Sequence, residues 1–207
     1  MQYFMTYVLG HQTVSGKKAQ LGTVVHKVME VLAGCKKLLQ DGDELLLEDD
    51  AIGEVEFTKR RLGTKKFVNE ILKRSYDHYT VPCTHHYTNA DYKFCDKLTW
   101  EALTYDGGNF DPRKRNIVAA EPQFDIAIEE DWASKVEGRL AIKGTIDLVT
   151  EVSDGVIEVI DWKTGRRLNW ATGEEKTYEK LCKDPQLMLY HYAISKLFPE
   201  YDDAIMS

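Results

Sequence analysis

Apolar residues recur at helical spacing along the first half of the chain. The clearest stripe consists of Leu21, Val24, Val25, Val28 and Leu32. It predicts a helix from about Lys18 to Leu39, and similar patterns predict helices from Lys65 to Tyr79 and from Cys95 to Leu103. Residues 41–56 form an acidic run that we expect to be a solvated loop or a short surface helix. The first half is therefore predicted to be mainly helical.

The hydrophobic pattern changes to alternation near Ile117. Ile117 to Ile128 is expected to form a strand or a strand pair that is interrupted at Pro122, because proline cannot donate a ladder hydrogen bond. Leu140 to Val152 and Val156 to Lys163 are expected to form a hairpin around Asp154-Gly155. Three consecutive antiparallel strands after a helical half indicate an α+β fold or an α/β/α sandwich.

The pattern returns to helical spacing near the end of the sequence. Asp184 is a good N-cap and Pro185 a good first helical residue, so we expect a helix to start at about Gln186 and to end before Pro199. Gln186 and Tyr190 are four residues apart and share one face of that helix. Residues 203–207 resemble the entry into another strand, and we expect that the chain could be a fragment of a longer protein.

Strand periodicity brings two carboxylates and an amine together in the predicted hairpin. If the turn spans Ser153 to Gly155, the numbers of opposing residues sum to 308 and Asp147 faces Asp161. Lys163 then shares the face of Asp161, while Trp162 points to the other side. Carboxylates that face one another repel unless a cation lies between them. The pattern therefore favours a divalent metal site, although Asp161 and Lys163 could also be a simple surface ion pair.

Composition limits what kind of protein carries this pattern. The chain has 207 residues, 43% hydrophobic and 29% charged, which suits one soluble domain with a helical part of about 1–115 and a β-rich part of about 116–207. We find no apolar run of about 20 residues and no secretory signal pattern, so we expect a cytoplasmic protein and no membrane partner. The net charge of −7 argues against non-specific coating of nucleic acid but not against a nucleic-acid enzyme.

Two further groups of residues leave alternatives open. His26 lies beside the first apolar stripe, on the flank that also carries Glu30, so it either faces a cleft or is hydrogen-bonded at the edge of the core. Cys83, His85 and Cys95 could hold zinc in an interaction domain, although their spacing does not match the common zinc motifs.

The arrangement of Asp147, Asp161 and Lys163 supplies the parts that phosphate-ester hydrolysis needs. Carboxylate oxygens hold a hard cation such as Mg²⁺, and the cation polarises the phosphoryl oxygen and lowers the pKa of a bound water. A neighbouring ammonium group can orient that water and offset charge in the transition state. The sequence thus predicts a metal-dependent hydrolase of phosphate esters.

Several short motifs resemble one known branch of nucleases. The segments Gly144-Thr-Ile-Asp147, Ile160-Asp161-Trp-Lys163-Thr-Gly165 and Gln186-x-x-x-Tyr190 resemble motifs of the RecB-like branch of the PD-(D/E)XK nucleases. That branch includes RecB-type exonuclease domains, CRISPR-associated adaptation nucleases and virus-encoded DNA exonucleases. Gly22-Thr-Val-Val-His26-Lys-Val-Met-Glu30 resembles the helix that supplies the branch with its metal-binding histidine. The resemblance implies an α/β (α+β) fold with a restriction-endonuclease-like core, in which helices flank a mixed central β-sheet.

The resemblance also implies roles for individual residues. His26, Asp147 and Asp161 would bind Mg²⁺ or Mn²⁺ together with the backbone carbonyl of Trp162, and Lys163 would be the catalytic lysine. Gln186 and Tyr190 would line the site and position DNA, and Glu121 would support the first core strand. For Arg166 and Arg167 we infer phosphate contacts from their charge and their place after the catalytic strand. Some members of the branch carry an iron–sulfur cluster, but we expect none here because the late cysteine triplet is missing.

These implications define the expected function. The chain would be a DNA exonuclease that leaves 5′-phosphates and acts in recombination, repair or replication, with DNA as substrate and recombination or replication proteins as partners. The resemblance to virus-encoded exonucleases leaves a viral origin open. The alternative is a non-catalytic nucleic-acid-binding module that keeps the nuclease fold within a larger recombination complex.

Overall fold

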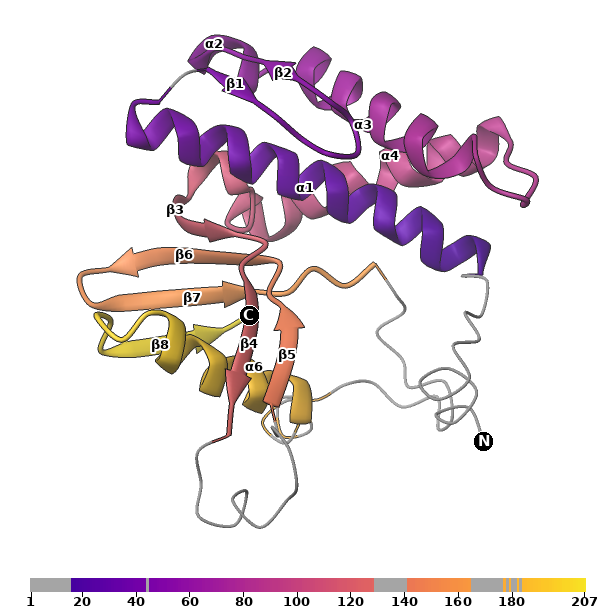
Figure 1. Cartoon of the computed structure of the whole chain (residues 1–207). Coiled ribbons are helices and arrows are strands. Elements are labelled where there is room, and N and C mark those ends of the chain that lie inside the picture. The colour runs from indigo at the N-terminus through magenta and orange to yellow at the C-terminus, as the bar shows by residue number, and fades with distance from the viewer. Residues whose placement is uncertain are drawn as a thin grey trace, which may run out of the picture.

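The structure, a computed structural model, describes residues 16–43, 45–128, 141–164, 177, 179, 182 and 184–207. Helix α1 lies between a helical layer and a β-sheet, and helix α6 packs on the sheet from its other side (Figure 1). The sheet is mixed, because one pair of its strands is parallel and the others are antiparallel. The expected fold class, a mixed central sheet flanked by helices with a helical N-terminal half, is confirmed.

The helical layer packs against α1, which spans Lys17–Asp41. All five residues of its predicted apolar stripe are buried. Helix α3 (Lys65–Thr80) matches its prediction, with Thr64 as N-cap, whereas α4 (Asn89–Thr104) starts six residues earlier than predicted. A capping box of Thr88 and Asp91 explains that earlier start. The short helix α2 (Lys59–Leu62) precedes α3, and the 3₁₀ turns Tyr105–Gly108 and Pro112–Lys114 follow α4.

The acidic run is neither a simple loop nor a helix. It contains the short antiparallel strands β1 (Leu46–Leu47) and β2 (Val55–Glu56). Between them, the Asp49 carboxylate accepts hydrogen bonds from the backbone N–H groups of Ala51 and Ile52. The buried side chain of Val55 anchors β2 to the helical core. Charge patterning alone did not predict these strands because burial of a few apolar residues outweighs the acidic character of the segment.

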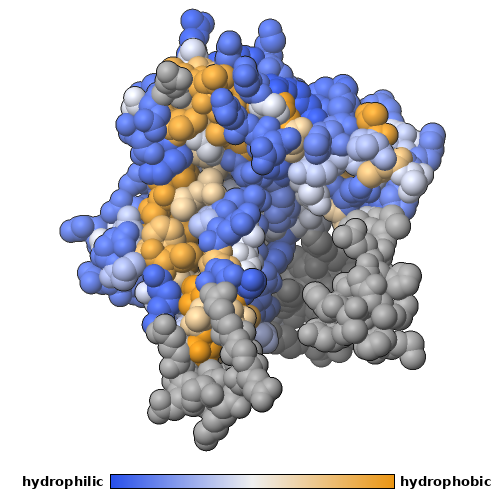
Figure 2. Space-filling model, in the orientation of Figure 1, coloured by the Kyte–Doolittle hydropathy of each residue, from blue (hydrophilic) through white to orange (hydrophobic). Residues whose placement is uncertain are grey.

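The central sheet has the strand order β3-β6-β7-β8. Its strands span Asn116–Ala120, Leu148–Ser153, Val156–Ile160 and Asp203–Met206. Leu148 and Ile160 pack with Ala33 on the α1 side, whereas Val149 and Val159 pack with Ile194 of α6. The two faces of the sheet are thus buried by different helices. On the face shown in Figure 2, apolar residues also form a visible band from the β1–β2 region down over this sheet.

The predicted strand pair at Pro122 and the predicted hairpin together form a corner. The strand pair is confirmed as β3 and β4 (Gln123–Ala127). The prediction of a single strand from Leu140 to Val152 is wrong. This segment is divided into β5 (Ala141–Thr145) and β6, and β5 pairs with β4 in a separate two-stranded sheet. Two backbone hydrogen bonds join the break between β3 and β4 to the break between β5 and β6. They run from Glu121 N–H to Asp147 O and from Ile146 N–H to Pro122 O, and both are 3.1 Å long. The chain therefore turns sharply at Asp147.

The register of β6 and β7 agrees with the predicted sum of 308 at the end of the hairpin nearest Asp147 and Asp161. Leu148 faces Ile160 and Glu151 faces Ile157. At the turn, Val156 faces Ser153 and not Val152, because a bulge shifts the register and leaves a two-residue turn. β6 begins one residue after Asp147 and β7 ends one residue before Asp161. The two carboxylates therefore lie just beyond the paired ends of the strands.

Helix α6 spans Pro185–Leu197 and begins as predicted. The Asp184 side chain accepts a hydrogen bond from Gln186 N–H at 2.9 Å, and Pro185 occupies the first helical position. Tyr190 and Ile194 are buried against the sheet. The N-terminal turn of α6 thereby lies near the ends of β5 and β7. None of the helices in the described part of the chain has the length and apolar character needed to cross a bilayer.

Candidate active site

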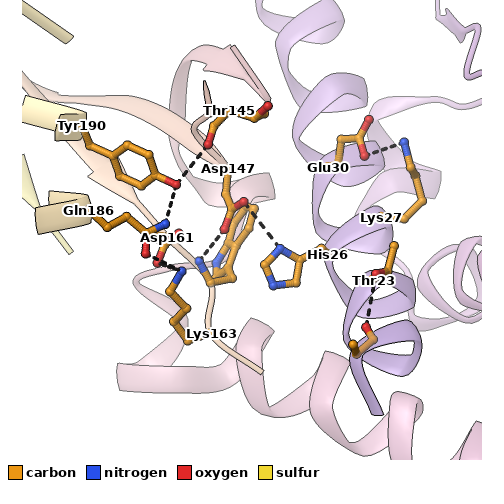
Figure 3. A network of polar contacts seen from close by, with 12 residues as sticks. Thr23, His26, Lys27, Glu30, Thr145, Asp147, Asp161, Lys163, Gln186 and Tyr190 are labelled. Atoms are coloured by element: carbon orange, nitrogen blue, oxygen red, sulfur yellow. Dashed lines mark hydrogen bonds and ion pairs between the residues drawn. The ribbon is translucent and has the colours of Figure 1, made fainter. Parts of the chain in front are cut away.

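Asp147 is the residue on which the candidate site is centred. Its carboxylate Oδ2 accepts a hydrogen bond of 2.8 Å from Trp162 N–H, which belongs to the segment after β7. Its Oδ1 lies 3.5 Å from Nδ1 of His26 on α1 (Figure 3). The sharp turn at the β5–β6 corner thus aims this carboxylate at both the helix and the segment that follows β7.

His26 faces the sheet from the flank of α1. The hydrogen bond to Asp147 raises the pKa of the imidazole, and Asp161 adds to the increase, while burial and Lys163 oppose it. The side chain is 29% exposed. The structure therefore shows a partly exposed histidine that contacts Asp147 between the helix and the sheet.

Asp161 and Lys163 follow directly from β7. The Asp161 carboxylate is 7% exposed and lies 2.5 Å from Nζ of Lys163, whose side chain is 55% exposed. The backbone N–H of Asp161 donates to Ser207 O at 3.0 Å, so the strand pairing with the β8 segment continues to this position. A fixed, nearly buried carboxylate and a partly exposed amine are thereby held side by side.

A chain of hydrogen bonds connects Lys163 to helix α6. Lys163 Nζ donates to Gln186 Oε1 at 3.3 Å, Gln186 Nε2 donates to the Tyr190 hydroxyl at 2.7 Å, and that hydroxyl donates to Thr145 O at 3.1 Å. Burial is the main cause that raises the pKa of Tyr190. The phenol therefore stays protonated as a donor at neutral pH. Figure 3 shows these side chains converging from α6, the β5 end and the segment after β7.

The side chains of Glu30 and Glu121 lie beside the site, and among the described residues they take no part in its side-chain hydrogen bonds. Glu30 pairs with Lys27 at 2.5 Å, and Lys27 also reaches Asp49 at 3.3 Å. Burial is the largest cause that raises the pKa of Glu30, and the charge of Glu121 raises it further. Glu121 has a left-handed backbone with φ 46°, and its N–H is the one that bonds to Asp147 O. Arg166 and Arg167 lie outside the described residues.

The charged side chains around Asp147 include the donor types of a metal-binding site. Among the residues that the structure describes, no three His, Cys, Asp or Glu side chains already stand as a metal-ligand cluster. His26 and Asp147 lie next to each other, whereas the Asp161 carboxylate is engaged by Lys163. Two carboxylates and an imidazole nevertheless have the donor chemistry that Mg²⁺ and Mn²⁺ accept. The donor atoms of these residues are therefore of the chemical type that binds Mg²⁺ or Mn²⁺.

The alternative zinc site receives no support from the cysteines. Cys95 is fully buried, and its Sγ lies 3.7 Å from the carbonyl oxygen of Leu21. Cys83 donates to Tyr79 O at 3.0 Å. Burial raises the pKa of the Cys95 thiol to about 12, which disfavours the thiolate form that zinc requires.

Backbone groups are the part of the site that the sequence did not predict. The expectation for Trp162 concerned its carbonyl, whereas the group that contacts Asp147 is its N–H. The carbonyl of Thr145 anchors Tyr190. Backbone groups carry no residue-specific signal, so only the sharp turn at Asp147 could have indicated them.

Comparison with known families identifies the superfamily to which the chain belongs. The model of the PD-(D/E)XK nuclease superfamily matches residues 1–204, and the chain belongs to this superfamily. Members are nucleases that generally use divalent metal ions. A search of curated proteins found no match to the chain.

Proposed function

We propose that the chain is a metal-dependent DNA exonuclease of the RecB-like branch that leaves 5′-phosphates and acts in recombination, repair or replication. The observation that carries this proposal is the convergence of Asp147, Asp161 and Lys163 beside His26. A carboxylate pair with an adjacent lysine serves hydrolysis, whereas a surface that only binds nucleic acid does not need it.

The metal ligands in this proposal are His26, Asp147 and Asp161, with the backbone carbonyl of Trp162. When bound, Mg²⁺ or Mn²⁺ would supply a Lewis acid for the phosphoryl oxygen and for a water molecule. Asp147 is held for this role by the N–H of Trp162, which fixes one of its oxygens. No iron–sulfur cluster is part of the proposal.

Lys163 is the proposed catalytic lysine. Its ammonium group would orient the attacking water and offset the negative charge that develops on the phosphate. Gln186 accepts a hydrogen bond from this amine, and Tyr190 fixes Gln186 in turn. We propose that these two residues limit the positions of Lys163 and also contact DNA.

Three further residues complete the proposed site. Glu121 would support it through its backbone bond to Asp147. Arg166 and Arg167 follow the Lys163 segment in the sequence and would contact phosphates. We also propose that the helical part and the β-rich part form a single nuclease domain, because Trp162 packs against the helical core and against the residues between α1 and the sheet.

The test is a comparison of DNA cleavage by the unchanged protein and by Lys163→Ala. End-labelled linear DNA and closed circular DNA, each single- and double-stranded, are incubated with Mg²⁺ or Mn²⁺. We expect cleavage of linear DNA only, and a loss on the order of 10²–10³-fold in the variant. Lys93→Ala, an exposed lysine on α4, is the matched control.

The outcomes separate the proposal from its alternative. Undiminished cleavage by Lys163→Ala would remove this lysine from the catalytic role, and cleavage of circular DNA would exclude a strict exonuclease. Tight DNA binding without any cleavage by the unchanged protein would favour the non-catalytic module. Asp147→Asn should in addition weaken Mn²⁺ binding in calorimetry, and unchanged binding would contradict the proposed ligand set.

A further inference from the structure

Within the described part of the chain, basic residues are most concentrated at residues 113–115 and 59–66, and the structure uses these two groups differently. At the first place, residues 113–115, all three cations serve internal contacts. Arg113 pairs with Asp111 at 2.7 Å, Arg115 pairs with Glu158, and Lys114 donates to a backbone carbonyl at 3.5 Å. The two guanidinium groups are thus neutralised by carboxylates, whereas Lys114 is exposed and has no carboxylate partner among the described residues.

The second concentration lies at α2 and the first turn of α3. It consists of Lys59, Arg60, Arg61, Lys65 and Lys66, with no acidic residue between them. Arg61 is neutralised by Glu70, with two hydrogen bonds of 2.9 and 2.7 Å. The other four side chains, which we call the basic patch, are exposed, and none has a carboxylate within 4.0 Å among the residues that the structure describes.

The backbone under the basic patch is well anchored. Leu62 and Phe67 are buried in the helical core. The side chains of Thr58 and Thr64 cap α2 and α3 by accepting hydrogen bonds from backbone N–H groups. Lys65 lies over the ring of Trp100, 5.3 Å from its centroid. The backbone that carries the patch is thus fixed before a ligand binds, which reduces the entropy lost in binding.

The patch also borders a hollow of about 420 Å³ between α2 and α3. Arg60 and Lys66 contribute to its wall, and so do the hydroxyl-bearing residues Thr58 and Thr64. The one carboxylate in the wall, that of Glu70, is already paired with Arg61. Ammonium, guanidinium and hydroxyl groups are the donors that contact phosphate oxygens in nucleic-acid complexes.

The basic patch is separate from the candidate active site. Helix α2 lies on the opposite side of α1 from the sheet (Figure 1). It follows directly on β2, whose partner β1 contacts α1 at Gly34 through Leu47. Gly34 is eight residues after His26, about 12 Å along the helix axis. At about 3.4 Å per base pair, a ligand that reaches both places must extend at least about four base pairs.

We propose that Lys59, Arg60, Lys65 and Lys66 form a second nucleic-acid contact, which binds the phosphate backbone of a DNA duplex beyond the part held at Asp147 and Lys163. The chain as a whole is negatively charged, with a net charge of −7, whereas the basic patch is a local group of four positive charges without carboxylate partners in the described part of the chain. Such a group attracts a polyanion, and the polyanion that a nuclease meets is its substrate. The inference rests on the proposed function in taking DNA as that substrate.

The test measures duplex binding without cleavage. The full chain is titrated with fluorescent duplexes of about 8, 16 and 32 base pairs in EDTA, at several salt concentrations. The double variant Arg60→Gln/Lys66→Gln is compared with Lys93→Gln/Lys97→Gln, which removes two positive charges from the exposed face of α4. Because no metal is present, the result does not depend on whether the chain cleaves DNA.

We expect the patch variant to bind the longest duplex on the order of tenfold more weakly, with a salt dependence reduced by about two ion equivalents. The loss should already be present with the shortest duplex, which is longer than the separation of about four base pairs, and the α4 control should bind like the unchanged protein. Equal binding by the patch variant at every length, or an equal loss in the control, would each overturn the proposal. So would tighter binding of polyglutamate than of DNA, which would identify an acidic protein as the ligand.

Discussion

Gly22 of α1 lies directly against Thr164, the residue that follows Lys163. A Cβ added at position 22 would be 2.7 Å from Oγ1 of Thr164 and 3.8 Å from its Cβ. Only glycine leaves room for this contact without movement. The segment that carries Asp161 and Lys163 can therefore approach the helix that carries His26.

Gly22→Ala should lower DNA cleavage about tenfold, because the added methyl group displaces the segment after β7 by a fraction of an ångström. The helix itself gains about 1 kcal/mol from the more favourable helix propensity of alanine. This gain offsets the cost of displacing the segment after β7, so the free energy of unfolding should change little. Cleavage kinetics and urea unfolding are measured side by side. Adding Thr164→Ala removes the oxygen in conflict and should restore most of the activity, and a double variant as slow as the single one would contradict this explanation.

Glu121→Gly should raise the free energy of unfolding by about 1 kcal/mol. Glu121 has φ 46°, a left-handed conformation that costs a residue with a side chain about 1–2 kcal/mol and costs glycine little. The backbone N–H that bonds to Asp147 O is kept in this variant. The measurement is the urea midpoint at constant m-value. Glu121→Ala keeps a Cβ and serves as control, so an equal gain in both variants would show that backbone strain is not the cause.

The stability of the protein should fall as the pH rises above about 8.5. Burial raises the pKa of both Cys35 and Cys95 to about 12. A free thiol in the unfolded chain titrates near pH 8.5, so the unfolded state loses these protons first and is favoured between about pH 8.5 and 12. Below about pH 8.5, the two protonated thiols contribute fully to the stability of the folded state. Each thiol should cost about 1 kcal/mol of stability between about pH 7.5 and 9.5.

The measurement for this pH effect is urea unfolding of the unchanged protein and of Cys35→Ala/Cys95→Ala. The double variant loses packing and has a lower stability at every pH. Its stability should nevertheless decline less steeply in the alkaline range. Parallel curves for the two proteins would show that other groups cause the decline.

Much of the fold follows from the pattern of apolar positions. The stripe on α1 and the Asp184 cap of α6 predicted these helices because their determinants are local. The break between β5 and β6 was not predictable, because Ile146 and Leu148 continue the strand pattern without interruption. That break is set by the hydrogen bonds of Glu121 and Ile146, which join segments about 25 residues apart.

The candidate site was predictable to the extent that it depends on side chains. Register arithmetic placed Asp147 near Asp161, and the resemblance added His26, Gln186 and Tyr190. The contact between His26 and Asp147 could not follow from periodicity, since it depends on how α1 packs against the sheet. The sequence also gave no reason to separate the basic residues at 59–66 from those at 113–115. Only the internal pairs of Arg113 and Arg115 distinguish the two groups.

The separation of the site residues along the chain has a consequence for protein synthesis. His26 lies near the start of the sequence, Asp147 and Lys163 lie more than 120 residues later, and Tyr190 lies later still. Contacts of such long sequence separation form late in folding, because the loops between them must close first. A nascent chain on the ribosome has α1 but not its partners. The contacts among these residues are therefore absent until the segment that carries Tyr190 has emerged and folded.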